Sequence, residues 1–204
     1  MALNTTHSHL GIIEFDSAPS TSGRRLLLKM LNRFFGISKL PEITTTPLGK
    51  PFFRSNLLPS FNISHSKTHV AVYLGNKEAV GCDIERIAFR PGWQNLAKTY
   101  FSKKEAEQLL AQNPDYDLRL FWKYWTAREA WLKQQGKSVW DMTLFALDIS
   151  SPQLKIIDTS EQLLPLTFQQ QQLCLCNTQP FTQMKSCQTF DRGIMISYEH
   201  STDS

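Results

Sequence analysis

The order of its segments restricts the fold of this chain more than any other feature of the sequence. Apolar strand-like segments lie on both sides of a helical stretch that covers residues 92–135. The group before it includes segments at 10–15, 61–64 and 69–85, and the group after it occupies residues 140–204. Two groups of strands separated by helices are typical of an α+β fold, which we therefore expect.

Helices and turns follow from local patterns. Residues 22–35 and 117–135 carry apolar side chains at helical spacing, and each segment is followed directly by a glycine, which commonly ends a helix. Gly75-Asn76 interrupts the apolar segment at 69–85, and this turn signal predicts a β-hairpin there.

The charge is unevenly distributed along the chain. Residues 1–102 carry 12 Lys and Arg against 6 Asp and Glu, whereas residues 103–204 carry 10 against 12. The net charge of +4 suggests an anionic partner, without the strong excess typical of nucleic-acid binding. A composition that is 41% apolar and 20% charged excludes a wholly disordered chain.

The expected compartment follows from three further patterns. No apolar run approaches the ~18–20 residues of a membrane span. The first residues lack the charged and apolar regions of a signal peptide. The four cysteines are too few and too scattered for a disulfide framework. We therefore expect a reduced, cytoplasmic protein.

Two carboxylates are predicted to share one face of a strand end. Side chains alternate along a strand, so Asp83 and Glu85 point to one side and Ile84 to the other. Like charges at this spacing repel each other unless a cation lies between them. Mg²⁺ suits such a place, since it binds one or two carboxylates together with phosphate oxygens and water. The alternative is a solvated strand end without metal.

A second candidate lies on the long helix. Glu129 and Lys133 are four residues apart and share a face, with Trp125 one turn earlier on the same stripe. An ordinary ion pair explains this spacing. A carboxylate shielded by aromatic rings is also a candidate metal ligand or general base.

Three weaker signals accompany these two. The polar end of the segment FNISHS, including Ser64 and His65, could bind phosphate oxygens, although a turn with a surface histidine explains it equally well. Lys50 offers a point charge in the loop Gly-Lys-Pro. Ser102 and Glu105 have the spacing of a capping box, the usual start of a helix.

Taken in order, five segments resemble a known family. GKP, FNISHS, VGCDIE, FSKKE and WTAREAWLKQQGK are similar to the 4′-phosphopantetheinyl transferases of the two-subdomain type, and most of all to the compact bacterial branch called the second holo-acyl-carrier-protein synthase. The resemblance covers roughly residues 22–185. It implies two similar subdomains related by a pseudo-twofold axis, each a small, mostly antiparallel sheet packed on a long helix. We expect these at residues 1–78 and 79–204.

The resemblance also implies an activity and a set of site residues. Members transfer 4′-phosphopantetheine from coenzyme A to a serine of an apo acyl-carrier protein, and adenosine 3′,5′-bisphosphate is released. The phosphates of coenzyme A would account for the basic first half. In this family, residues matching Asp83, Glu85 and Glu129 bind Mg²⁺. The residues that contact coenzyme A match Arg24, Lys50, Ser64, His65 and Lys133. The catalytic base has been considered to match Glu129 or Glu105. We favour Glu129, because capping already explains Glu105.

The expected partners are therefore coenzyme A and an apo carrier protein, with neither nucleic acid nor membrane involved. A monomer is expected, because one chain supplies both halves of the cleft. Two alternatives remain open. Asp83, Glu85 and Glu129 would also serve a metal-dependent phosphohydrolase or nuclease, and the basic first half would also serve a non-catalytic binding module.

Overall fold

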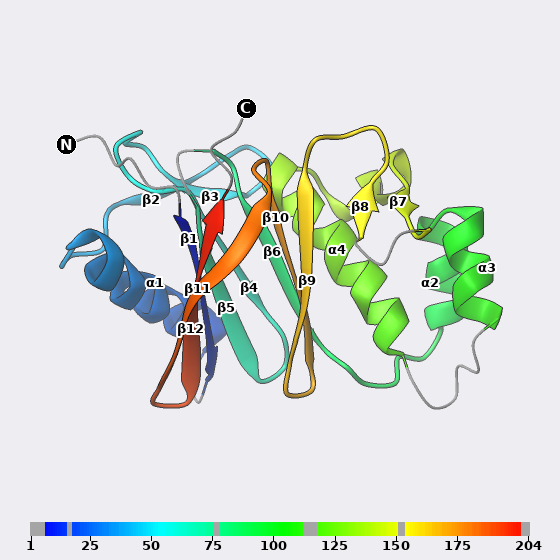
Figure 1. Ribbon diagram of the computed structural model, residues 1–204, viewed down its shortest axis with the longest axis horizontal. Helices are drawn as coiled ribbons and strands as arrows, with labels where there is room; N and C mark the ends of the chain where they lie inside the picture. Colours follow the sequence, from blue (N-terminus) through cyan, green and yellow to red (C-terminus); the bar gives the residue numbers. More distant parts are fainter. Residues whose placement is uncertain (1–6, 16–17, 76–77, 112–117, 151–153, 201–204) are drawn as a thin grey trace.

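Two five-stranded antiparallel sheets lie side by side in the computed structural model, which describes residues 7–15, 18–75, 78–111, 118–150 and 154–200 (Figure 1). Sheet 1 has the order β11-β12-β1-β5-β4, with β1 (His7–Glu14), β4 (Phe61–His65), β5 (His69–Leu74), β11 (Phe181–Phe190) and β12 (Gly193–His200). Sheet 2 has the order β6-β10-β9-β8-β7, with β6 (Gly81–Arg86), β7 (Leu147–Asp148), β8 (Lys155–Ile156), β9 (Gln162–Phe168) and β10 (Gln171–Asn177). β2 (Ile43–Thr45) and β3 (Pro51–Phe53) form a separate pair.

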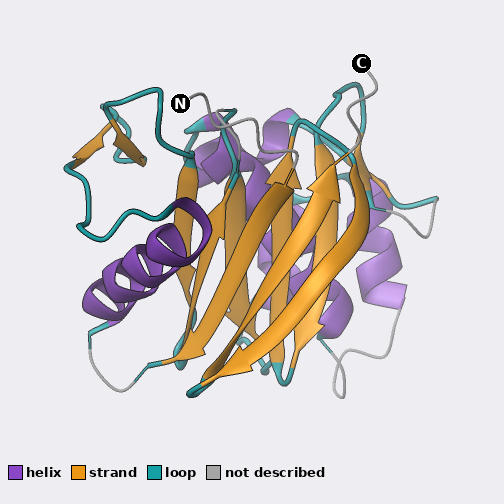
Figure 2. Ribbon diagram, turned by 60° about the vertical axis from the view of Figure 1, so that its left-hand side comes forward, coloured by secondary structure: helices purple, strands orange, loops and turns teal. Residues whose placement is uncertain are grey.

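Helices cover the outer faces of both sheets (Figures 1 and 2). The first helix, α1 (Pro19–Phe35), packs on sheet 1, and α4 (Arg119–Gln135) packs on sheet 2. Two shorter helices, α2 (Trp93–Tyr100) and α3 (Lys103–Ala111), and the 3₁₀ helix η1 (Val139–Leu144) contribute to the core around α4. The α+β class and the pairing of each sheet with one long helix are thus confirmed.

Strand alternation divides the apolar side chains among three cores. On β6, Cys82 and Ile84 face a core that both sheets share. On β10, Leu173 and Leu175 also face that shared core, whereas Cys174 and Cys176 face α4. The intervening Asp83 therefore points away from the shared core, as the alternation predicts.

The two long helices end as predicted. Gly36 and Gly136 follow α1 and α4 with φ angles of 69° and 67°. Only glycine adopts this left-handed conformation without a steric penalty, and the bends let the next backbone N–H groups bond to the last turn of each helix.

The hairpin expected at 69–85 is wrong. β5 pairs with β1 on one side and β4 on the other, so it has no edge left for β6. β6 instead pairs with β10 in sheet 2. Consecutive strands β5 and β6 thus belong to different sheets, which local turn signals do not reveal; Asn76 of the predicted turn lies outside the described residues.

The last two strands lie in sheet 1, although residues 79–204 are expected from the sequence to form a unit of their own. β12 pairs with β1 from Gly193 to Glu199, and β11 pairs with β12. The C-terminal hairpin thus belongs to the same sheet as β1, β4 and β5. In the described residues, no helix combines the length and the apolar character needed to cross a membrane.

Candidate functional site

The site lies where the edges of the two sheets meet, at β4 and β6. Side chains, not backbone pairs, join these two edges. Asn62 Oδ1 accepts the N–H of Cys82 at 3.0 Å, and Ser64 Oγ accepts the N–H of Ile84 at 3.4 Å. Because residues 62 and 64 share one face of β4, both side chains reach the same neighbouring strand. The junction thus brings the FNISHS segment beside the GCDIE segment.

A glycine lets α4 approach the same strand. A Cβ atom on Gly81 would lie 1.9 Å from the carbonyl oxygen of Ala130 and 2.6 Å from the backbone nitrogen of Gln134. Both are backbone atoms that a side chain cannot displace without moving the helix. The absence of a side chain at this position therefore sets the short distance between β6 and α4, and it brings Lys133 within reach of Asp83.

Asp83, Lys133 and Ser64 form the centre of the site. Lys133 Nζ donates to Asp83 Oδ1 at 2.6 Å and to Ser64 Oγ at 3.0 Å, and Ser64 Oγ donates to Asp83 Oδ1 at 2.8 Å. Asp83 is 3% exposed, and its second oxygen, Oδ2, is buried without a hydrogen-bond partner. Among the described residues Lys133 thus forms its ion pair with Asp83 from another element, and not with Glu129 four residues earlier on the same helix.

The charges of the neighbouring groups act on one another. Burial raises the pKa of Glu85 to about 7, and the charges of Asp83 and Glu129 add to this rise, against Lys133 and Arg90. Burial and then Asp83 also raise the pKa of Glu129, and Lys133 opposes them. The pKa of Lys133 is itself raised, because Asp83 and Glu129 outweigh the effect of burial. The charges of Asp83, Glu85 and Glu129 thus act on one another in a partly buried region.

A hard cation would suit this donor set, although the side chains are not closed around one. Within the described residues, no three His, Cys, Asp or Glu side chains are close enough together to hold a metal ion. However, Oδ2 of Asp83 has no hydrogen-bond partner, and burial disfavours Glu85 and Glu129 as anions. A divalent cation relieves both of these costs, so these three residues fit Mg²⁺.

Three lysines line a cavity of about 200 Å³ beside this centre: Lys50, Lys133 and Lys137, together with Asn62 and residues 48–51. Lys50 Nζ donates to the carbonyl oxygens of Gln134, at 2.6 Å, and Val80, at 3.3 Å. Burial lowers the pKa of Lys50 to about 8, so it is still largely protonated at neutral pH. The cavity therefore suits an anion, although Lys50 is already tied to two carbonyls.

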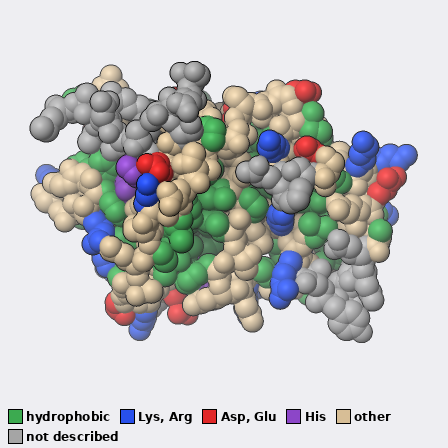
Figure 3. Space-filling model, viewed as in Figure 1, with side chains coloured by type: hydrophobic (Ala, Val, Ile, Leu, Met, Phe, Trp, Pro, Cys, Tyr) green, Lys and Arg blue, Asp and Glu red, His purple; other side chains and the backbone are tan. Residues whose placement is uncertain are grey.

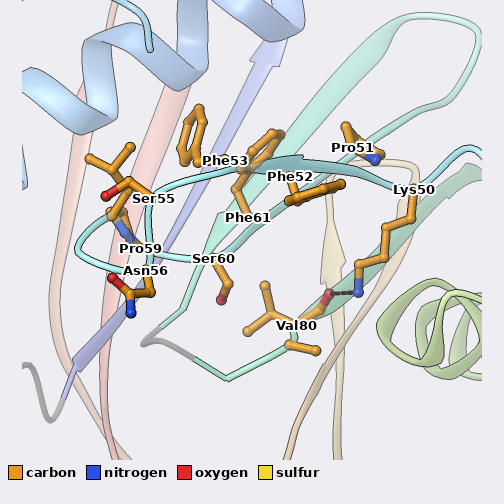
Figure 4. A pocket seen from close by; sticks show the side chains of 12 residues that line it. Lys50, Pro51, Phe52, Phe53, Ser55, Asn56, Pro59, Ser60, Phe61 and Val80 are labelled. Atoms are coloured by element: carbon orange, nitrogen blue, oxygen red, sulfur yellow. Dashed lines mark hydrogen bonds between the residues drawn. The ribbon is translucent and has the colours of Figure 1, made fainter. Parts of the chain in front are cut away.

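A second cavity, of about 260 Å³, lies on the other side of Lys50 (Figure 4). Its lining includes Phe53, Phe61 and Val80 among apolar side chains, and Ser55 and Asn56 among polar ones. Because Lys50 and Pro51 line both cavities, the Gly-Lys-Pro loop separates an apolar space from a basic one.

The other predicted residues are less closely grouped. Ser64 is buried in the centre of the site, but the adjacent His65 points outward and is exposed. Arg24 is exposed on α1. Among the described residues that line the cavity of the three lysines, neither Arg24 nor His65 is present. Glu105 lies on α3, where its capping box with Ser102 is formed as predicted, and it also pairs with Arg128.

Two residues of the site were not singled out from the sequence. Asn62 joins the sheets, and the alternation that places it on the same face as Ser64 would have been the signal. Lys137 lines the basic cavity, two residues beyond the end of α4. Nothing in the local sequence indicates that Lys137 and Lys50 line the same cavity.

The sequence comparisons identify the family of the chain. Residues 79–184, which include β6 and α4, match the profile of the 4′-phosphopantetheinyl transferase superfamily. The chain is 36% identical over 167 residues to the 4′-phosphopantetheinyl transferase AcpT of Salmonella typhimurium, covering 79% of this chain and 77% of that protein. AcpT of Escherichia coli K12 is 37% identical, over 79% and 75% of the two chains.

A more distant relative is the 4′-phosphopantetheinyl transferase Sfp of Bacillus subtilis strain 168, which is 30% identical over 125 residues, or 61% of this chain and 54% of Sfp. The family expected from the five sequence segments is therefore confirmed. The chain belongs to the 4′-phosphopantetheinyl transferase superfamily of enzymes.

Proposed function

We propose that this enzyme transfers 4′-phosphopantetheine from coenzyme A to a serine of an apo carrier protein, in a reaction that depends on Mg²⁺. The observation that carries this proposal is the buried, unpartnered Oδ2 of Asp83, which lies among carboxylates that burial disfavours as anions. A cation and a phosphate group placed there would satisfy all of these groups. The lysine-lined cavity next to it supports a phosphate-bearing donor.

Each residue has a role in this proposal. Asp83, Glu85 and Glu129 would hold Mg²⁺, which supplies positive charge to the pyrophosphate when it is bound. Lys133 keeps Asp83 oriented and lies on the cavity side, where it can donate to a phosphate oxygen. Ser64 fixes both of them. Lys50 secures the loop that borders the cavity.

The transfer forms one bond and breaks another. The serine oxygen of the carrier attacks the phosphorus that bears the pantetheine group, and the bond from this phosphorus to the bridging oxygen breaks. Adenosine 3′,5′-bisphosphate departs with that oxygen. We propose that Glu129 takes the serine proton, because the alternative, Glu105, is held by its capping box with Ser102 and its ion pair with Arg128.

The two alternatives lead to different expectations. A phosphohydrolase or nuclease would use the same carboxylates with water as the acceptor. A basic binding module would favour a surface of one charge sign, yet on the face shown in Figure 3 Lys and Arg are interspersed with Asp and Glu. A monomer in the cytoplasm agrees with the proposed role.

Intact-mass measurement of an apo carrier protein tests the proposal. After incubation with the enzyme, coenzyme A and Mg²⁺, the carrier should gain one phosphopantetheine group. Glu129→Gln should leave the fold intact and abolish this gain. Hydrolysis of coenzyme A without a carrier would favour the hydrolase, and no mass gain with any of several carrier classes would exclude the transferase.

A further inference from the structure

A fully buried ion pair lies on another face of α4, directly beside the proposed base in the sequence. Arg128 Nη2 is 2.5 Å from Glu105 Oε2, and neither side chain is exposed. Because burial of charge is unfavourable unless other contacts compensate for it, the surroundings of this pair should satisfy its polar atoms.

Both oxygens of Glu105 are occupied by structural donors. Oε2 also accepts the N–H of Ser102 at 2.5 Å, at the start of α3. Oε1 accepts the N–H of Leu147 at 3.0 Å, at the start of β7. A general base needs direct or water-mediated contact with the proton that it takes. A side chain with 0% exposure and both oxygens engaged offers no such route.

Arg128 links α4 to the segment that follows it. Its Nη1 donates to the carbonyl oxygens of Met142, at 2.7 Å, and Phe145, at 3.1 Å. The guanidinium carbon lies 5.0 Å from the ring centre of Phe101 and 4.8 Å from that of Phe145. These contacts use the planar fork of arginine, and a lysine could not make all of them.

Arg128 and Glu129 are consecutive on α4, so their side chains point about 100° apart around the helix axis. The contacts that hold Arg128 in place therefore also set the direction of the Glu129 side chain. We propose that Glu105 is a positioning residue: with Arg128 it fixes the rotation of α4 that directs Glu129 toward Asp83, and it takes no proton in the reaction. This inference rests on the proposed transfer, and it removes Glu105 from the candidates for the base.

The first test is the pH profile of a variant that lacks the carboxylate. Glu105→Gln leaves the buried charge of Arg128 unpaired, and kcat should fall while KM for coenzyme A stays within about twofold. Because Glu105 takes no proton in the proposal, the acidic limb of the pH profile of kcat should persist in this variant at the reduced rate. Loss of that limb in protein that circular dichroism shows to be folded would show that Glu105 is the base, which overturns the proposal.

The second test keeps Glu105 intact. Arg128→Lys retains the charge but cannot reach Glu105, Met142 and Phe145 together, so kcat should fall about 10- to 100-fold in protein that circular dichroism shows to be folded. An unchanged kcat would mean that the pair only stabilises the fold, and the proposal would again be wrong.

Two controls separate these outcomes from other causes. Glu107→Gln removes an exposed carboxylate from the same helix α3, whose partner is Lys103, and it should change neither midpoint nor kcat. The native enzyme is assayed first for transfer to a carrier protein. Failure at that stage concerns the proposed function, whereas a lost acidic limb in Glu105→Gln or an unchanged kcat in Arg128→Lys concerns only the pair.

Discussion

Lys133 of α4 forms an ion pair with Asp83 of β6 beside the junction of the two sheets, with Nζ 2.6 Å from Oδ1. The contact leaves the other oxygen of Asp83 buried and unpartnered. One carboxylate is thus held in place by a lysine while half of its hydrogen-bonding capacity stays available. This relationship is the basis of the first two predictions.

Replacement of Lys133 by Met should lower transfer by about 10²–10³-fold, because a charge that favours the reacting phosphate is lost. It should also lower the free energy of unfolding, since Asp83 loses its ion-pair partner. Mg²⁺ should raise the melting temperature of this variant more than that of the native protein. Lys133→Arg is the control that keeps the charge. Equal Mg²⁺ effects on the Met variant and the native protein would argue against a shared site.

Mg²⁺ should stabilise the protein more strongly as the pH rises from 5 to 8. The pKa of Glu85 is raised to about 7 in the folded protein. Without metal, Glu85 therefore contributes most to stability below the pKa that it has in the unfolded chain. This contribution is lost as the pH rises toward 7. A cation binds the ionised form and offsets that loss. Melting temperatures with and without Mg²⁺ across this range provide the measurement. In Glu85→Gln the difference should be smaller and less dependent on pH.

Gly81→Ala should lower the free energy of unfolding by at least about 2 kcal/mol, because the added methyl group collides with the backbone of α4. Activity should fall as well, since β6 and α4 must move apart and carry Asp83 away from Glu129. Gly36→Ala serves as the comparison. Its position has open space but a positive φ, so it should cost only about 1–2 kcal/mol and leave kcat unchanged. Urea titration and the carrier assay measure both effects, and an equal cost at the two positions would rule out the collision.

The C-terminal hairpin should loosen from sheet 1 at acidic pH. Pro180 carbonyl oxygen lies 3.2 Å from His200 Nδ1, which must therefore carry the proton, and His200 Nε2 accepts from Ser8 Oγ at 2.7 Å. Burial lowers the pKa of His200 and lowers that of His9 to about 4. Histidine has a pKa of about 6.5 in the unfolded chain. The contribution of His200 and His9 to stability is therefore present above this pH and is lost as the pH falls below it.

The check on this prediction is the urea midpoint at pH 5 and pH 7.5. His200→Asn should narrow the difference between the two midpoints relative to the native protein, with His9 accounting for part of what remains. Glu85 titrates in both proteins and cancels from the comparison. His65→Gln, at an exposed histidine, is the matched control. Equal differences in the native protein and His200→Asn would refute a role for His200.

Local sequence determined most of the elements and the faces of their residues. The alternation on β6 placed Asp83 opposite Ile84, and the glycines after α1 and α4 ended both helices where expected. These features depend on backbone geometry over a few residues, so a single sequence contains them. The alternation also placed Asn62 beside Ser64, although its role emerged only with a neighbouring strand.

The tertiary structure decided which elements meet. It assigned β6 to sheet 2, against the hairpin expected from the sequence, and it placed β12 beside β1 in sheet 1. It brought Lys133 to Asp83 and sealed Glu105 against Arg128. Strand pairing and contacts between distant residues depend on which edges and cavities the rest of the chain leaves available. The spacing of residues within one segment does not show which edges and cavities remain available. The sequence therefore indicated the chemistry of the site, and the fold determined its geometry.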